Sequence, residues 1–302
     1  MMMLDEAIKL LNQGQNPDGG WGAVPGKQSN TESTALGLLA LRSLADSSEN
    51  PAVRNAKHWL SSSQRSDGSW PYGAGATAAS WSTALALIAL SDSGVEGERL
   101  VRAGNWILAQ EGSKPGILAK LILALSFQKK AVHLNDDLIG WSWTPSSFSW
   151  VEPTSYCLIA LKKIKSRLSE KAVKERVDQA ELMIYDRMCE GGGWNYGNTA
   201  VYGDPLWPYP DITGLALIAL QNHKERSENQ VSLRVLSKMA ENTDSGLALG
   251  WSSICLSLYG QDNPELRKRL DQRFGRTKFL GETKPIALSI LAAGDGSRLF
   301  RV

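Results

Sequence analysis

A repeated polar turn that ends in tryptophan constrains the fold of this chain more than any other feature of its sequence. The turn reads Gln-x-x-Asp-Gly-x-Trp at residues 15–21 and again at 64–70, and a worn copy spans 189–194. Copies separated by about 35 to 60 residues are typical of proteins that stack helical hairpins. Glycine and aspartate supply the backbone angles of the turn, and we expect the tryptophan to cover the end of a hairpin.

A second repeated segment, made of small residues and leucines, follows the turns. It is apolar on nearly every side, which predicts helices surrounded by protein. Clear copies span 35–41, 84–90 and 215–220, and looser copies span 118–125, 156–161, 252–258 and 286–292. The segments before the turns mix charged and apolar residues at helical spacing, which predicts helices with one buried stripe. These segments span 51–63, 98–110, 169–188, 229–241 and 264–274.

The alternation of fully buried and half-exposed helices predicts two concentric rings. We expect an all-α fold: a single α/α toroid of six to seven helical hairpins over about residues 4–295, within one domain that spans residues 1–302. Residues 128–151 and 199–210 are rich in aromatic side chains and have little helical character. We expect two loops there at the ends of the barrel, and long loops are more often functional than decorative.

The composition excludes several classes of protein. Thirty-three basic and thirty-one acidic residues leave a net charge of +2, which argues against binding nucleic acid through phosphate contacts. Three cysteines are too few and too scattered for a disulfide framework. We find no signal peptide and no apolar run of about 18 residues. We therefore expect a cytoplasmic protein without a transmembrane segment. Peripheral association with a membrane is compatible with the same sequence.

The turns and the helices that follow them resemble the prenyltransferase and squalene-oxidase repeat. That repeat builds the α/α barrels of squalene–hopene cyclases, other class II terpene cyclases and the β subunits of protein prenyltransferases. The likeness covers about residues 4–295 and is greatest to the short bacterial proteins that amount to a single barrel. It implies a barrel fold, which in this family serves cyclases, transferases and non-catalytic proteins.

Class II cyclases begin one inner helix with Asp-x-Asp-Asp-Thr-Ala, and the middle aspartate protonates an alkene or an epoxide. The frame at 30–35 reads Asn-Thr-Glu-Ser-Thr-Ala, and the frame at 209–214 reads Tyr-Pro-Asp-Ile-Thr-Gly. Each keeps the middle acid, Glu32 or Asp211, and lacks the flanking aspartates. The cyclase motif is therefore present only in fragments.

Protein prenyltransferases bind zinc through aspartate, cysteine and histidine, and their histidine stands just before an inner helix. The segment 152–158 resembles that helix, but Pro153 stands where the histidine would be. The three histidines and three cysteines of the chain also lack the spacing of metal ligands. We therefore predict no metal and no cofactor.

Three predicted inner helices begin with an acid two residues before a threonine, at Glu32, Glu152 and Asp211. All inner helices of a toroid start at the same rim, so these carboxylates are expected to form an arc around one mouth of the barrel. Asp211 is the favoured acid catalyst, because aromatic neighbours disfavour the charged form of a carboxyl group. Capping is the alternative, since acids and threonines at helix starts stabilise helices by about 1 kcal/mol each.

Aromatic residues in loops and at helix starts are the candidate lining for an apolar ligand. Ring faces stabilise carbocations and enclose hydrocarbon chains, and simple packing of the rim is the alternative. Lys284 stands near the start of an inner helix and is the candidate contact for a diphosphate. The predicted substrate-binding residues are Trp81, Trp143, Trp150, Tyr202, Trp207, Tyr209, Trp251 and Lys284.

Three functions are compatible with these features. The first is a terpene-cyclase-like or prenyl-group enzyme, an isomerase, lyase or transferase that acts on an isoprenoid in the central cavity. The second is a non-catalytic barrel that binds a lipid or a partner protein at its aromatic rim. The third is a carbohydrate-active α/α barrel, since paired acids and tryptophan platforms also suit sugars. The acid arc favours an enzyme, whereas the fragmentary motif favours a binding protein.

Overall fold

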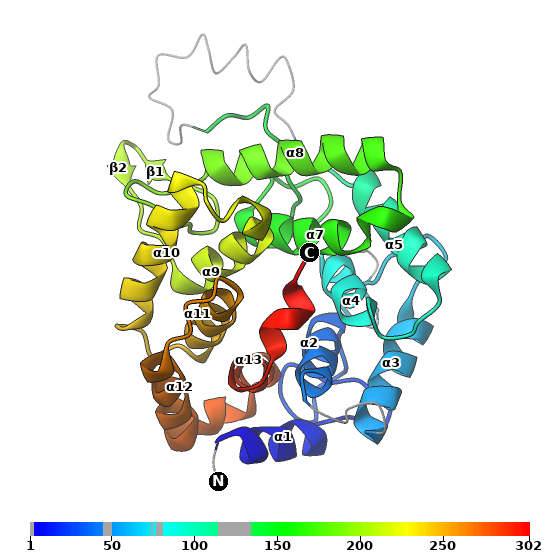
Figure 1. Ribbon diagram of the computed structural model, residues 1–302. Coiled ribbons are helices and arrows are strands. Elements are labelled where there is room, and N and C mark those ends of the chain that lie inside the picture. The colour runs from blue at the N-terminus through cyan, green and yellow to red at the C-terminus, as the bar shows by residue number, and fades with distance from the viewer. Residues whose placement is uncertain (1–2, 45–49, 74, 77–80, 114–133) are drawn as a thin grey trace.

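Two concentric rings of helices form the protein, as Figure 1 shows. The computed structural model describes residues 1–302 except 1–2, 45–49, 74, 77–80 and 114–133. Within the described residues the inner helices are α2 (Thr31–Arg42), α4 (Ser82–Leu90), α7 (Val151–Ile164), α9 (Pro210–Ala219), α11 (Gly246–Leu258) and α13 (Thr283–Ala293). The outer helices are α1 (Met3–Gln13), α3 (Pro51–Ser63), α5 (Gly97–Ala109), α8 (Glu170–Asp186), α10 (Ser227–Ala240) and α12 (Pro264–Thr277).

The predicted α/α toroid is confirmed. Each inner helix packs against the next, and α13 packs against α2, so the inner ring is closed. Every residue of α4 is buried, whereas α3 buries a single stripe of residues at helical spacing. The hydrophobic pattern of the sequence therefore separates the two rings. Outer helix α1 was not predicted, and the helical copy expected at 118–125 lies outside the described residues.

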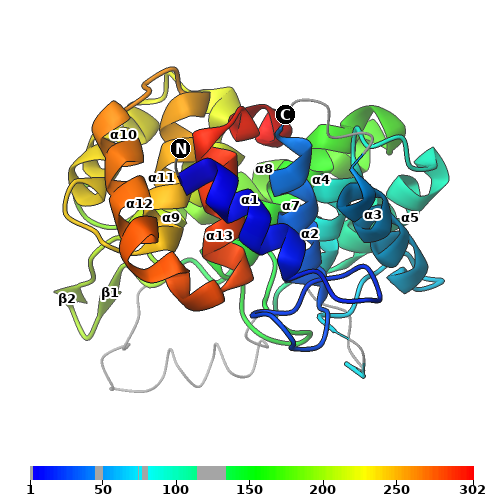
Figure 2. The same ribbon diagram turned by 90° about the horizontal axis from the view of Figure 1, so that it is seen from below.

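The second predicted loop contains a small hairpin that the all-α expectation missed. Strands β1 (Ala200–Val201) and β2 (Asp204–Pro205) pair antiparallel, with Val201 opposite Asp204. The two residues between them, Tyr202 and Gly203, have φ values of 53° and 93°. Positive φ at both central positions is typical of the tight turns that join antiparallel strands. In Figure 2 this hairpin lies at the bottom, with the loops that precede the inner helices.

Four tryptophans in the turns before α2, α4, α7 and α9 each make the same two hydrogen bonds. The backbone N–H of Trp21 donates to Oγ1 of Thr34 (3.0 Å), and its indole N–H donates to the carbonyl of Leu11 (2.7 Å). Equivalent pairs of bonds join Trp70 to Thr83 and Leu60, Trp141 to Thr154 and Ile107, and Trp194 to Thr213 and Ile184. Trp141 is thus a fourth turn tryptophan that the sequence pattern did not reveal.

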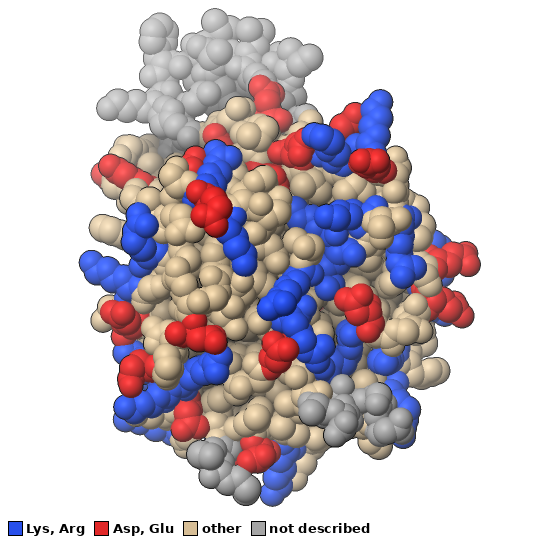
Figure 3. Space-filling model, viewed as in Figure 1, with Lys and Arg blue, Asp and Glu red and all other residues tan. Residues whose placement is uncertain are grey.

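Basic side chains cap the carbonyl ends of the inner helices. Arg42 donates to the carbonyls of Ala89 and Ser91 at the end of α4, and Lys224 donates to Leu258 at the end of α11. Figure 3 shows Lys and Arg side chains gathered over the centre and right of this face. Basic groups stabilise this end because the carbonyl ends of helices carry partial negative charge.

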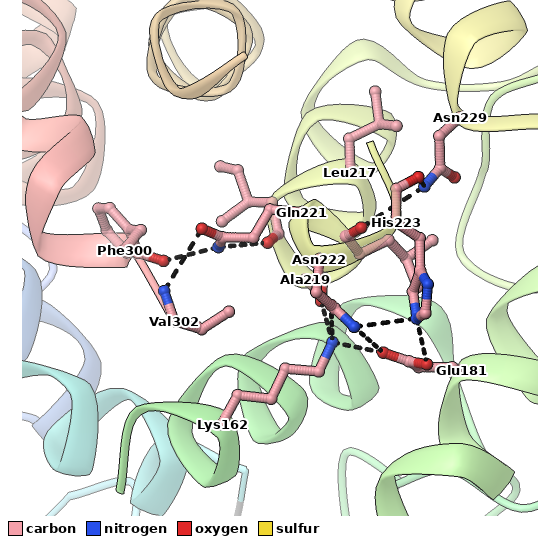
Figure 4. A network of polar contacts seen from close by, with 12 residues as sticks. Lys162, Glu181, Leu217, Ala219, Gln221, Asn222, His223, Asn229, Phe300 and Val302 are labelled. Carbon is pink, nitrogen blue, oxygen red and sulfur yellow. Dashed lines mark hydrogen bonds and ion pairs between the residues drawn. The ribbon is translucent and has the colours of Figure 1, made fainter. Parts of the chain in front are cut away.

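Lys162 makes the most buried of these contacts (Figure 4). Its ammonium lies 2.5 Å from a carboxylate oxygen of Glu181 and donates to the carbonyl of Ala219 (2.6 Å) and to Asn222 (2.6 Å). Glu181 also contacts the ring of His223 at 2.8 Å. Although Lys162 begins a run of basic residues at the end of α7, where solvated side chains are usual, its own side chain is only 6% exposed.

The C-terminal segment closes one end of the barrel. It forms a short 3-10 helix, η5 (Gly296–Phe300), that crosses the centre of the ring in Figure 1 and lies at the top in Figure 2. Phe300 is fully buried, and the side chain of Gln221 donates to its carbonyl at 2.8 Å. The other 3-10 helices are η2 (Lys165–Arg167), η3 (Gln221–His223) and η4 (Lys278–Gly281). None of the described helices is long and apolar enough to cross a membrane.

Candidate active site at the mouth of the barrel

The repeat places the three predicted acids at equivalent positions of three inner helices. Glu32, Glu152 and Asp211 each lie in the first turn, two residues before the threonine that accepts a hydrogen bond from a turn tryptophan. The threonines therefore have a structural role. The carboxylates take no part in these hydrogen bonds and lie at the mouth of the barrel. Trp81 has the same position relative to Thr83 at the start of α4.

Lys284, in the first turn of α13, joins two of these acids. Its Nζ lies 2.8 Å from Oε1 of Glu32 and 3.5 Å from Oε1 of Glu152. The Lys284 side chain is 26% exposed and those of Glu32 and Glu152 are 14% and 9% exposed, so the cluster is partly shielded from water. The ammonium predicted to contact a diphosphate is thus already paired with two carboxylates.

Burial makes Glu152 hold its proton unusually well. The pKa of Glu152 is raised from 4.5 to about 7, chiefly by desolvation and also by the charges of Glu32 and Asp211, against the opposing effect of Lys284. Burial also raises the pKa of Asp211, although backbone N–H groups at the start of α9 act in the other direction. The pKa of Lys284 is well above its ordinary value, because its negative surroundings outweigh its desolvation. The site therefore supplies a carboxylic acid close to neutral pH.

A small cavity opens beside these groups. Its volume is about 50 Å³, enough for a water molecule or a small functional group. Glu152, Asp211 and Lys284 form its polar side, and the rest of the wall is apolar or aromatic. The lining residues of this kind are Tyr196, Ile212, Leu215, Leu247 and Trp251.

Five aromatic rings contact one another in a continuous column beside the acids. The rings of Trp143 and Trp81 meet edge to face at 5.1 Å, and Trp81 stacks on Tyr156 at 5.5 Å. Tyr156 lies 6.0 Å from Trp251, whose other neighbour is Phe300 of the C-terminal segment at 5.4 Å. Three predicted binding residues, Trp81, Trp143 and Trp251, thus belong to one continuous column.

Sequence reasoning missed Tyr156, which lies one turn after Glu152 on α7. Its side chain is fully buried, and its hydroxyl has no hydrogen-bond partner among the described residues. Burial raises the pKa of Tyr156 well above its usual value, and the charges of the acid cluster also act on it. The spacing of four residues from Glu152 was a signal for this residue, because residues four apart share one face of a helix.

The other predicted binding residues lie farther out on the rim. Tyr202 and Trp207 are 73% and 82% exposed. Tyr209 is half-exposed, and its ring lies 5.7 Å from that of Tyr196. Trp150 lines a separate pocket of about 290 Å³ with Phe148 and Arg187.

A larger pocket lies on the outer side of Trp81. Its volume is about 310 Å³, and it lies between α4, α5 and α7. Tryptophan side chains dominate its walls, together with Ile107 and Cys157, and Glu111 stands among its polar groups. The tryptophans are Trp81, Trp106, Trp141 and Trp143. Trp81 and Trp143 therefore separate this aromatic pocket from the rings that lead to the acids.

Within the described part of the chain, no three His, Cys, Asp or Glu side chains gather in a way that could hold a metal ion. The three cysteines are buried free thiols. The chemistry that the described cluster can supply is proton transfer from a carboxyl group next to aromatic and aliphatic side chains.

Solved structures with this fold include both terpene cyclases and glycoside hydrolases. The type II terpene cyclase MstE from Scytonema matches with a TM-score of 0.61 and 15% identity, over 98% of this chain and 97% of that one. An alpha-amylase from Clostridium perfringens matches with a TM-score of 0.61 and 10% identity, over 96% and 97%. An inactive variant of an alpha-1,6-mannanase of Salegentibacter, in complex with alpha-1,6-mannotriose, matches with a TM-score of 0.60 and 10% identity, over 98% of each chain.

The comparison establishes an α/α toroid like that of type II terpene cyclases. The Scytonema enzyme has also been solved with its substrate, geranylgeranyl dihydroxybenzoate. No protein-family model and no curated protein sequence matches this chain. At these identities the likeness defines the fold alone, so the activity has to be argued from the site.

Proposed function

We propose that this protein is a terpene-cyclase-like enzyme that protonates an isoprenoid at the mouth of the barrel. The observation that carries the proposal is Glu152, a buried carboxyl group with a pKa of about 7 beside an apolar, aromatic wall. A carboxylic acid can protonate an alkene or an epoxide only while it is neutral. Near pH 7 a large fraction of Glu152 is in that form.

We assign the proton-donor role to Glu152 and supporting roles to its neighbours. Asp211 lines the same cavity, and its negative charge favours the protonated form of Glu152. Lys284 neutralises Glu32, which limits the accumulation of negative charge. Asp211 was the favoured acid on sequence grounds, whereas the deeper burial of Glu152 makes it the better candidate in the structure.

The apolar part of the substrate is expected to lie against Trp251 and the aliphatic side chains of the cavity wall. The cavity of about 50 Å³ accommodates only the reacting group, so the hydrocarbon chain has to extend toward the aromatic rim or displace rings of the column. Aromatic faces next to the cavity suit this chemistry, because they stabilise the carbocation that protonation creates.

The test is turnover of linear isoprenoids by the purified chain, with products identified by gas chromatography and mass spectrometry. A panel of farnesol, geranylgeraniol, squalene and 2,3-oxidosqualene covers alkenes, alcohols and an epoxide. The variant Glu152→Gln should abolish product formation and retain the fold. Glu282→Gln is the matched control, because Glu282 lies at the same rim and is exposed. Recovery of every isoprenoid unchanged, although bound, would instead support the non-catalytic barrel.

A second candidate function is that of a glycoside hydrolase. The exposed aromatic side chains at the rim support it. Tyr202, Trp207 and Tyr209 present exposed rings on the loop that leads into Asp211. Exposed aromatic rings beside a pair of carboxyl groups, of which Glu152 has a pKa of about 7, also suit the binding and cleavage of sugars. Release of reducing ends from an α-mannan or starch, lost in Glu152→Gln, would favour this function over isoprenoid chemistry.

A further inference from the structure

The hydroxyl of Tyr156 is a buried polar group on an inner helix that the proposed function does not use. It belongs to a side chain with no measurable exposure, and no described residue accepts its hydrogen bond. Buried hydroxyls are nearly always hydrogen-bonded in native proteins, and each exception requires an explanation. A phenol that donates to nothing in the folded chain is therefore a candidate for donating to a bound molecule.

Tyr156 lies close to the acid cluster, although it is not itself among the residues that line the cavity. Tyr156 follows Glu152 by one helical turn, so the two side chains share the inner face of α7. Its ring is held between Trp81 at 5.5 Å and Trp251 at 6.0 Å, and Trp251 lines the cavity beside Glu152 and Asp211. The ring stack fixes the phenol in place, which reduces the entropy lost when it binds a ligand.

We infer that Tyr156 is a ligand-binding residue whose hydroxyl donates a hydrogen bond to an oxygen atom of the molecule bound at the mouth. This inference rests on the proposed function and narrows its substrate class to an oxygen-bearing isoprenoid, such as an alcohol, ether or epoxide. A pure hydrocarbon would leave the Tyr156 hydroxyl without an acceptor. Because burial keeps Tyr156 in its neutral phenol form, it donates throughout the physiological pH range.

The test compares two probes that differ by one oxygen: farnesol and the triene hydrocarbon with the same skeleton but no hydroxyl. Dissociation constants follow from the quenching of tryptophan fluorescence, which Trp81 and Trp251 should report. Tyr156→Phe should weaken binding of farnesol about tenfold, or roughly 1.4 kcal/mol. The same variant should leave the affinity for the hydrocarbon unchanged. Tyr185→Phe, which removes a hydroxyl on the outer helix α8, should change neither affinity.

Thermal unfolding separates this role from a structural one. Tyr156→Phe should unfold at the same temperature as the wild type or at a higher one, because it removes a buried hydroxyl that has no partner in the chain. A clear loss of stability, or equal weakening of both probes, would overturn the ligand-binding role. Binding of both probes with no effect of Tyr156→Phe would overturn this inference alone. Failure of the wild type to bind either probe would overturn the isoprenoid proposal and this inference with it.

Discussion

Nζ of Lys284 lies 2.8 Å from Oε1 of Glu32, and this ion pair joins the last inner helix to the first. The closure of the ring thus brings together a cation and an anion from opposite ends of the sequence. The same ammonium group contacts Glu152 on a third inner helix, so one lysine links the inner helices α13, α2 and α7. The electrostatics of the candidate site therefore depend on the ring being closed.

Removal of this lysine should destabilise the fold. In Lys284→Met, Glu32 and Glu152 lose their cation, and we expect the free energy of unfolding to fall by about 1 to 3 kcal/mol, because the pair is only partly shielded from water. Urea denaturation at pH 7 measures this change. Lys278→Met is the matched control, since its pair with Glu6 is more exposed and should contribute less than about 1 kcal/mol. Equal losses in the two variants would contradict the prediction.

Glu152 should make stability depend on pH. Its pKa in the folded state, about 7, exceeds its ordinary value of 4.5, so the folded state binds this proton more tightly than the unfolded state. The stabilisation is therefore full below about pH 4.5 and is lost as the pH rises through about 7. Between pH 5 and pH 8 we expect a loss of roughly 1 to 3 kcal/mol from this group.

Urea denaturation at several pH values tests this contribution. In Glu152→Gln the part of the pH dependence between about pH 4.5 and 7 should disappear, and Glu282→Gln should keep the wild-type profile. If the protein turns over an isoprenoid, activity should also fall above pH 7, because the acid form of Glu152 is lost. A profile unchanged by Glu152→Gln would show that another group titrates in this range.

The bond from the turn tryptophan to the helix-start threonine should be required for stability. In Thr154→Val the backbone N–H of Trp141 loses the acceptor that it meets at 2.9 Å, inside the protein. We expect a loss of about 1 to 3 kcal/mol, since a buried donor is left without a partner. Thr154→Ser keeps the hydroxyl and should recover most of the stability. The exposed Thr144→Val should have little effect, and a similar loss there would contradict this account.

Phe300 should anchor the C-terminal segment. Its ring is fully buried against Trp251, so Phe300→Ala should lower the free energy of unfolding by about 3 to 5 kcal/mol. Phe148→Ala provides the control, because Phe148 is 60% exposed and should lose far less. Chemical denaturation with tryptophan fluorescence follows both variants, and equal stability of the two would show that the segment contributes little packing.

Lys162 should contribute more than a surface lysine. Lys162→Met leaves Glu181 buried without its cation, and we expect a loss of about 3 to 5 kcal/mol. Lys174→Met is the control, because Lys174 pairs with Asp178 on the surface of α8. The difference between their denaturation midpoints measures the contribution of burial, and matching midpoints would contradict it.

The sequence predicted the bounds of most outer helices, but it did not predict which side chains contact one another at the mouth of the barrel. The mixed segment 51–63 matches α3 to the residue, because one stripe of apolar residues at helical spacing requires a helix with one buried face. By contrast, Tyr156 was placed on an inner helix without being assigned to the site. A residue inside an apolar helix gives no sign in sequence of whether it points to the barrel axis or to a neighbouring helix.

The sequence by itself determined the helices after α1, their order and the equivalence of Glu32, Glu152 and Asp211, since each of these follows from residues close together in the chain. Only the tertiary structure decided which acid is most buried, that Lys284 pairs with two of them, and that the aromatic rings beside them form one column. Desolvation and charge pairing depend on groups that approach from several helices at once. The distances between these groups are set when the ring of helices closes, so they cannot be predicted from the residues next to each group in the sequence.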